Sequence, residues 1–342
     1  MISITENKAQ KLKKIIDNAD NIAVITHKNP DGDAIGSALA LQLFLKNRKK
    51  NVQVIVPGDY PLFLKWLPGT KDVVIFEHEE TQARKAVLGA DLIFALDFNM
   101  TERIEDMDKV YKEANGIKFL IDHHPNPDNI AEHIFSDISV SSTAELLYWF
   151  LNQVFQHPEL DKDIAVCLFT GIMTDTGCFN FNASLPGTYR AVAELLSFGI
   201  DKDEIFDLVY NNFSEHRMRL LGYCLDKKMQ VFQSHAAACI SITREELKKY
   251  HFVRGDEEGM VNYPLSVKGV SLAAIFIEKE DHIKISFRSK GNVPANRIAR
   301  DHFNGGGHKN AAGGKYYAPL SDTIKKFISI LPVYMNINKD GN

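Results

Sequence analysis

The feature that most constrains this chain is a set of short apolar runs that alternate with amphipathic stretches over its first half. The apolar runs are Asn21–His27, Val52–Val56, Asp72–Phe76, Asp91–Asp97 and Lys118–Asp122. The stretches with helical spacing are Ala34–Leu45, Glu79–Leu88 and Ile104–Ala114. Strands that alternate with helices predict parallel βαβ units and an open α/β sheet.

The pattern becomes helical after Ser142 and mixed after about Val231. The expected helices of the middle part are Thr143–Val154, Ile164–Thr174, Pro186–Phe198, Lys202–Tyr210 and Glu215–Lys227. Later, strands are expected at His235–Ile242, Val270–Glu278 and His282–Arg288, and helices at Arg244–Tyr250 and Ala295–His302. We therefore expect an α/β protein with a larger N-terminal lobe (1–185), a helical connection (186–228) and a smaller mixed α/β C-terminal lobe (229–342).

Charge and cysteine content limit the function classes. The net charge is -4, so no global positive field would hold a long polyanion, and a nucleic-acid partner must be short or gripped locally. The four cysteines form no CxxC pair, which favours reduced, buried thiols over zinc or disulfides. Without an apolar run of about 20 residues or a basic leader, we expect a cytoplasmic protein with no membrane contact.

Acidic and histidine side chains follow the predicted strands. The first cluster is His27 with Asp31 and Asp33, where Pro30 and Gly32 make a tight turn that lets the three side chains converge. The alternative is a simple turn in which Asp33 caps the next helix. Capping explains one carboxylate and leaves the second acid and the histidine unexplained, so we favour a metal site.

Three further clusters occupy the ends of apolar segments. Asp97 ends a strand-like run, which suits a metal ligand or a turn residue equally well. Asp122, His123 and His124 end another, and adjacent imidazoles can bind metal and substrate separately. Asp175 ends an apolar helix, where the macrodipole disfavours an acid, so it needs a cation or an ordinary basic side chain as partner. Histidines mixed with carboxylates suit a pair of manganese ions.

A glycine-rich segment, 304–314, follows the helix predicted at Ala295–His302. Dense glycine lets a backbone approach a ligand closely and point amides at an anion, although such a run is often only a linker. His308 and Lys309 inside it, with Arg288 and Lys290 upstream, supply donors for phosphate. We predict a phosphate-binding loop.

Together these segments resemble the DHH phosphoesterase family. The matching segments are HKNPDGDAIGS at 27–37, ALD at 95–97, DHH at 122–124 and TGIMTDTG at 170–177. GGGHKNAAGG at 305–314 resembles the signature of the DHH-associated C-terminal domain. The resemblance implies a bilobed protein with two divalent metal ions in the larger lobe, manganese first and magnesium or cobalt as alternatives. It also implies an active site in the cleft between the lobes.

The resemblance also implies roles for single residues. His27 and Asp31 would bind the first ion, Asp33, His123 and Asp175 the second, and Asp97 would bridge them. His124 would contact the scissile phosphate, and Asp122 would orient the histidines. Arg288 and His308, with the amides of Gly306 and Gly307, would hold another part of the nucleotide. Lys290 and Lys309, predicted above as phosphate donors, complete the expected substrate-binding residues.

Within the family, the size and two-domain layout resemble the oligoribonuclease (nanoRNase)/pAp phosphatases most. The expected substrates are therefore short single-stranded RNA and 3',5'-bisphosphoadenosine (pAp), with no long duplex as partner; a homodimer stays open. Cyclic or linear dinucleotide phosphodiesterase activity is the alternative. Exopolyphosphatase or pyrophosphatase-like activity ranks lower. A non-catalytic nucleotide sensor also ranks lower, since a sensor has no need of a complete set of metal ligands.

Overall fold

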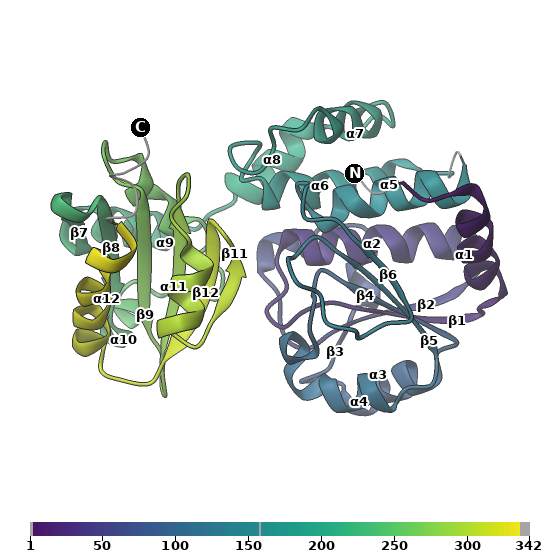
Figure 1. Cartoon of the computed structure of the whole chain (residues 1–342), viewed down its shortest axis with the longest axis horizontal. Coiled ribbons are helices and arrows are strands. Elements are labelled where there is room, and N and C mark those ends of the chain that lie inside the picture. Colours follow the sequence, from purple (N-terminus) through teal and green to yellow (C-terminus); the bar gives the residue numbers. More distant parts are fainter. Residues whose placement is uncertain (1–2, 157–158, 336–342) are drawn as a thin grey trace. The chain divides into compact units, whose positions relative to one another are not determined.

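The computed structural model describes residues 3–156 and 159–335 and divides into two compact units, Met1–Asn212 and Phe213–Asn342 (Figure 1). The first unit is built on a six-stranded sheet in the order β3-β2-β1-β4-β5-β6, and all its strand pairs are parallel. Its strands are β1 (Asn21–Ile25), β2 (Asn51–Val56), β3 (Val74–Ile75), β4 (Leu92–Leu96), β5 (Ile117–Asp122) and β6 (His133–Ser136). The predicted parallel α/β sheet is confirmed.

The order of the strands reverses between β1 and β4. The chain runs outward from β1 through β2 to β3, then returns to place β4 on the other side of β1. Ligands of open α/β sheets bind outside the carboxyl ends of strands at such a switch point. His27 follows β1 and Asp97 follows β4, so both lie there.

Helices cover both faces of this sheet. α1 (Glu6–Asn18), α2 (Gly32–Asn47), α5 (Thr143–Phe155) and α6 (Lys162–Asp175) lie on one face, and α3 (Glu80–Leu88) and α4 (Asp108–Glu113) on the other (Figure 1). A Cβ at Gly36 would lie 2.5 Å from the Cys167 carbonyl oxygen, and one at Gly171 2.5 Å from the Ala144 Cβ. Glycine therefore lets α2, α5 and α6 approach closely, which draws the polar ends of these helices together.

The segment 186–228, expected as a connection, is helical and is shared by the two units. α7 (Pro186–Leu196) and α8 (Lys202–Tyr210) belong to the first unit. α9 (Glu215–Tyr223) and a π-helical turn at Cys224–Lys228 belong to the second.

The second unit contains a six-stranded mixed sheet in the order β11-β12-β10-β9-β8-β7, in which only β8 and β9 pair in parallel. Its strands are β7 (Met229–Phe232), β8 (Ala237–Ile242), β9 (Leu272–Glu278), β10 (Ile283–Ser289), β11 (Gly306–His308) and β12 (Ala311–Tyr316). α11 (Ala295–His302) and α12 (Leu320–Met335) pack on one face. α9, α10 (Arg244–Lys249) and the 3₁₀ helix Met260–Ser266 pack on the other.

The prediction that the glycine-rich segment forms a loop is wrong, because 306–308 and 311–316 form two antiparallel strands. A Cβ at Gly305 would lie 1.9 Å from the Gly313 carbonyl oxygen, and one at Gly314 2.5 Å from that of Phe303. These glycines allow close backbone packing that the sequence pattern does not reveal. Shorter 3₁₀ segments occupy Leu62–Leu64, Thr70–Asp72, Thr101–Met107 and Gln233–His235.

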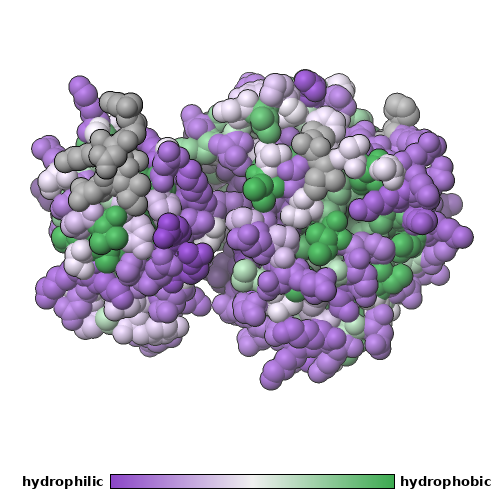
Figure 2. Space-filling view, in the orientation of Figure 1, coloured by the Kyte–Doolittle hydropathy of each residue, from purple (hydrophilic) through white to green (hydrophobic). Residues whose placement is uncertain are grey.

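No described helix is long and apolar enough to cross a lipid bilayer. On the face drawn in Figure 2, hydrophilic side chains predominate and hydrophobic ones form separate small groups.

Candidate active site

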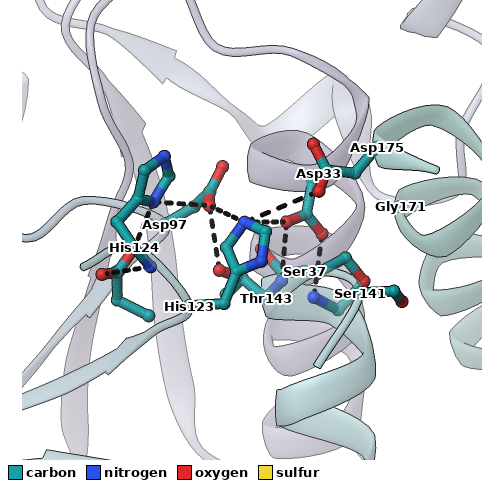
Figure 3. A network of polar contacts seen from close by, with 12 residues as sticks. Asp33, Ser37, Asp97, His123, His124, Ser141, Thr143, Gly171 and Asp175 are labelled. Carbon is teal, nitrogen blue, oxygen red and sulfur yellow. Dashed lines mark hydrogen bonds and ion pairs between the residues drawn. The ribbon is translucent and has the colours of Figure 1, made fainter. Parts of the chain in front are cut away.

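Polar side chains of the first unit converge at the switch point of its sheet (Figure 3). His27 follows β1, Asp97 follows β4, and Asp122 ends β5 with His123 and His124 directly after it. Asp31 and Asp33 lie at the start of α2, and Asp175 ends α6. The structure therefore brings all eight of these sequence-predicted residues of the N-terminal lobe to one place.

The two acids of the first cluster have different local roles. Asp31 is the N-cap of α2, and its Oδ1 accepts hydrogen bonds from the amides of Asp33 (3.0 Å) and Ala34 (3.1 Å). The capping alternative therefore applies to Asp31 and not to Asp33. Asp33 is buried, and its carboxylate accepts the amides of Thr143 (2.7 Å) and Ala144 (2.8 Å).

Those two amides begin α5, where the first N–H groups of a helix have no intrahelical acceptor. The positive end of α5 therefore holds the carboxylate of Asp33 in place. Sequence reasoning missed Thr143 and Ala144, because their contacts with Asp33 join segments 110 residues apart or more.

Asp97 lies at the centre of the cluster. Its Oδ1 accepts a hydrogen bond from the Thr143 hydroxyl (2.9 Å), and its Oδ2 lies 3.3 Å from Nε2 of His27. The same carboxylate also lies 3.7 Å from Nε2 of His123. One carboxylate thus faces both halves of the site, as a bridging ligand must.

His123 points into a ring of acids. Its Nε2 lies 3.6 Å from Asp175 Oδ2, 3.7 Å from Asp97 Oδ1 and 3.9 Å from Asp33 Oδ2. These distances are too long for hydrogen bonds but leave room for an ion among the four groups. His123, when protonated or bound to a metal, would be the cationic partner that the place of Asp175 at the end of α6 requires.

His27 provides the clearest indication of a metal. Its Nδ1 lies 2.9 Å from the Lys28 carbonyl oxygen, which can only accept, so Nδ1 carries the proton. The buried Nε2 faces Oδ2 of Asp97 at 3.3 Å. A second proton on the imidazole makes this contact an ion pair, and a divalent ion in place of that proton would take both atoms as ligands, so the residues fit a metal ion.

His124 is oriented by Asp122. Nδ1 of His124 donates to Asp122 Oδ1 (2.7 Å), and the His124 backbone amide donates to Oδ2 (2.9 Å). Because Nδ1 faces the carboxylate, the tautomer is set and Nε2 is the nitrogen that can face a substrate. Burial raises the pKa of Asp122 to about 7, and the nearby charge of Asp97 adds to this effect.

The other pKa shifts show that the site concentrates negative charge. Burial and the charges of Asp97, Asp175 and Asp31 raise the pKa of Asp33 well above its usual range. Burial alone would lower the pKa of His27 and of His123, but the neighbouring carboxylates outweigh it and raise both. Burial opposes ionisation of Asp97, yet His27, His123 and the more distant Arg103 lower its pKa to about 2.

Three triads of the first unit have ligand atoms within 4.8 Å of one another and could each hold an ion. Two of them match the predicted ligand sets, His27, Asp31 and Asp97 in one and Asp33, His123 and Asp175 in the other, and the third is Asp97, Asp122 and His124. Nitrogen and carboxylate ligands of this kind suit first-row divalent metals. The individual metal-binding roles remain predictions.

The substrate-binding residues expected in the second unit lie around β12. Arg288 of β10 and His308 of β11 both pair with Ala311, so their side chains project on the same side of the sheet. Lys290 Nζ donates to the Leu265 carbonyl, and Lys309 Nζ to Asn292 Oδ1 (2.9 Å). Gly306 and Gly307 both belong to β11.

Comparison with known proteins finds two matching domain families and several similar proteins. The DHH family N-terminal domain matches residues 21–172, and the DHHA1 domain matches 249–332. The bifunctional oligoribonuclease and PAP phosphatase NrnA of Bacillus subtilis (strain 168) is 28% identical over 90% of this chain and 93% of its own. The protein of the same name from Thermus thermophilus is 31% identical over 85% of this chain and 83% of its own.

A solved structure is more similar still. The crystal structure of an exopolyphosphatase-related protein from Bacteroides fragilis is 41% identical and superposes with a TM-score of 0.94, covering 99% of this chain and 100% of that one. With both domains matched in order and the strand-end acids and histidines gathered at the switch point, the chain belongs to the DHH family and is a hydrolase of phosphate esters.

Proposed function

We propose that this enzyme is a manganese-dependent phosphoesterase that degrades short oligoribonucleotides and dephosphorylates pAp in the cytoplasm. The names of the Bacillus and Thermus relatives support this substrate class. The observation that carries the metal dependence is that the ligand atoms of His27, Asp31 and Asp97 lie within 4.8 Å of one another, as do those of Asp33, His123 and Asp175.

In this proposal His27 and Asp31 would hold one ion, Asp33, His123 and Asp175 would hold the other, and Asp97 would serve both. The ions would supply activation of water and neutralisation of the phosphoryl oxygens. Thr143 and Ala144 keep Asp33 in position through their amides, and the Thr143 hydroxyl does the same for Asp97.

His124 acts on the substrate itself. Because Asp122 accepts a hydrogen bond from Nδ1–H, the imidazole has a fixed orientation, and Nε2 can donate a hydrogen bond to the scissile phosphate or the leaving oxygen when protonated. In the second unit, Arg288 and His308 bind another part of the nucleotide through their common side of the sheet.

A substrate panel tests the proposal. Purified enzyme with manganese is offered pAp, oligoribonucleotides of two to five residues, the dinucleotide pApA, cyclic di-AMP, pyrophosphate and polyphosphate. We expect the highest kcat/KM on the short linear RNAs, cleavage of pAp, and loss of activity after chelation.

The panel also separates the alternatives. Preference for cyclic di-AMP or pApA would identify a dinucleotide phosphodiesterase. Preference for polyphosphate, a candidate favoured by the name of the Bacteroides structure, would identify an exopolyphosphatase. Absence of turnover on every substrate with manganese bound would contradict an enzymatic role and favour a nucleotide sensor.

A further inference from the structure

On one face of the second sheet, the 3₁₀ helix Met260–Ser266 reaches β10, and the hydrophobic core of the described residues does not extend over β12 and β11. Along β10, Ile283, Ile285 and Phe287 are buried in the core beneath α11 and α12. The alternate residues Lys284, Ser286 and Arg288 face the other side and are only partly buried. The hydrophobic core on that side is built from β8 and β9 and includes no residue of β10, β11 or β12.

The strand register arranges the residues of this side in rows across the sheet. Ser286 pairs with Gly313, which pairs with Gly306. Arg288, Ala311 and His308 form the next row in one direction, and Lys284 with Lys315 forms the next row in the other. Directly paired residues project on the same side, so a row almost without side chains lies between two basic rows. We call these eight residues the bare face.

The two glycines of the bare face have no explanation in the fold. Gly306 and Gly313 are exposed, and neither has a positive φ. A Cβ at Gly306 would meet nothing within 4 Å, and one at Gly313 only the Ile285 carbonyl oxygen at 3.6 Å. Gly305 and Gly314, in contrast, are required by close packing. Glycine weakens a strand, so its presence at 306 and 313 indicates that something outside the fold approaches the backbone closely.

The charges beside this row favour a polyanion. Lys284 is four residues from Arg288 along β10, or roughly 14 Å. Lys284 forms an ion pair with Glu257 (2.8 Å), yet 41% of its side chain stays exposed. Just beyond the Lys284–Lys315 row, Tyr317 is 66% exposed and its ring lies 6.0 Å from that of His282. An exposed aromatic ring next to basic groups is typical of surfaces that bind single-stranded nucleic acid.

We infer that the bare face is a binding subsite for the further nucleotides of a single-stranded oligonucleotide. This inference rests on the proposed function. The subsite extends the nucleotide-binding anchor made by Arg288 and His308. The sugar-phosphate chain lies over Gly313 and Gly306, the next phosphate reaches Lys284 and Lys315, and a base stacks on Tyr317. This subsite makes substrates of three to five residues better than dinucleotides.

The experiment compares a dinucleotide with a tetranucleotide in three variants. Gly313→Val fills the glycine row, Lys315→Glu reverses a charge, and Tyr317→Ala removes the ring. Each is expected to lower kcat/KM on the tetranucleotide about tenfold, the worth of one nucleotide contact, and to leave the dinucleotide nearly unchanged. Lys315→Glu should also reduce the slope of log affinity against log salt by about 0.7 or more for the lost phosphate contact.

Controls separate this inference from folding and from the proposed function. Lys325→Glu makes the same charge change on α12, which packs on the opposite face, and should alter neither substrate. Gly313→Ala replaces the valine variant if its melting curve shows disturbed folding. Equal effects on both substrates, or none on the tetranucleotide, would overturn the subsite. If wild-type enzyme cleaves neither RNA, anisotropy of a fluorescein-labelled tetranucleotide still compares binding by wild type and variants.

Discussion

Asp97, the acid at the centre of the candidate site, has an unusual backbone conformation. Its φ is +64°, in the left-handed region that non-glycine residues rarely adopt. Its amide donates to the Ile121 carbonyl (3.2 Å), which ties the end of β4 to β5. Such strain is concentrated at functional sites, where the surrounding structure holds it. Among residues other than glycine, aspartate and asparagine tolerate this conformation best, so the position accepts asparagine without a backbone change.

The first prediction is that Asp97→Asn abolishes turnover and leaves the protein folded. The asparagine keeps the left-handed backbone and the side-chain shape, but it removes the charge that faces both His27 and His123. We expect kcat to fall by more than about 100-fold at saturating manganese. Activity assays and a circular dichroism melt measure the two effects. Near-normal turnover would disprove the bridging role.

The second prediction concerns the Thr143 hydroxyl. Thr143→Val keeps the shape and the amide bond to Asp33 but removes the hydrogen bond to Asp97. Groups that orient metal ligands are typically worth about 10–100-fold in metal affinity, so we expect manganese to bind about tenfold more weakly. Thr143→Ser, which retains the hydroxyl, should restore binding. Calorimetric titration with manganese checks this, and equal affinity in all three proteins would exclude the role.

At the scale of elements, the β11–β12 hairpin shows that glycines close in sequence can serve different purposes. Gly314→Val places a Cβ 2.5 Å from the Phe303 carbonyl oxygen. Overpacking of this kind costs about 1–3 kcal/mol, so the variant should melt earlier. Gly306→Val is the matched control, because its Cβ meets nothing and β-branched residues favour strands. Urea unfolding compares the two, and equal losses would show that both glycines serve the fold.

The start of α10 gives a prediction about pH. Thr243 and Glu246 form a capping box, and Glu246 Oε1 also accepts bonds from Lys228 (2.8 Å) and Tyr223 (2.5 Å). Burial opposes ionisation, but these partners lower the pKa of Glu246 from 4.5 to about 2. A lowered folded-state pKa stabilises the protein above pH 4.5 and ceases to do so as the pH falls toward 2.

Glu246→Gln should therefore lower the free energy of unfolding at pH 7 by about 1 kcal/mol. The difference from wild type should shrink as the pH falls below 4.5. Chemical denaturation at several pH values measures this difference. A gap that stays constant down to about pH 2.5 would contradict the cause assigned to the shift.

At the scale of the whole molecule, each unit has its own sheet and its own hydrophobic cores. The compact units divide between Asn212 and Phe213, although sequence reasoning placed its boundaries at 185 and 228. The predicted metal ligands all belong to the first unit, and Arg288 and His308 belong to the second. Chemistry and substrate binding can therefore be separated by experiment.

The fragment 1–212 should fold, bind manganese and hydrolyse bis(p-nitrophenyl) phosphate at a rate near that of the full chain. Its kcat/KM on dinucleotides should fall by at least about tenfold, because the anchoring groups of the second unit are missing. Parallel assays of fragment and full chain decide the matter. A fragment that cleaves dinucleotides as well as the full chain would deny the second unit a substrate role.

What the sequence determined by itself was the class of the fold and the gathering of the site. The alternation of apolar runs and helices requires a parallel sheet, and the carboxyl ends of its strands share one edge. His27, Asp97 and Asp122 were therefore expected at one edge of the sheet, and the adjacency of β1, β4 and β5 made them neighbours. Asp175 was also predictable, because an acid at the end of an apolar helix needs a partner.

Tertiary structure decided which backbone amides hold which acidic side chain. Asp31 caps its own helix, and Asp33 is held by amides at the start of a helix that lies 110 residues further along the chain. Whether a glycine at 305–314 serves packing or remains bare depends on how close another backbone lies. The break at Asn212 likewise depends on which core α7 and α8 join. Local patterns carry no record of these long-range contacts, because they form only when distant segments pack together.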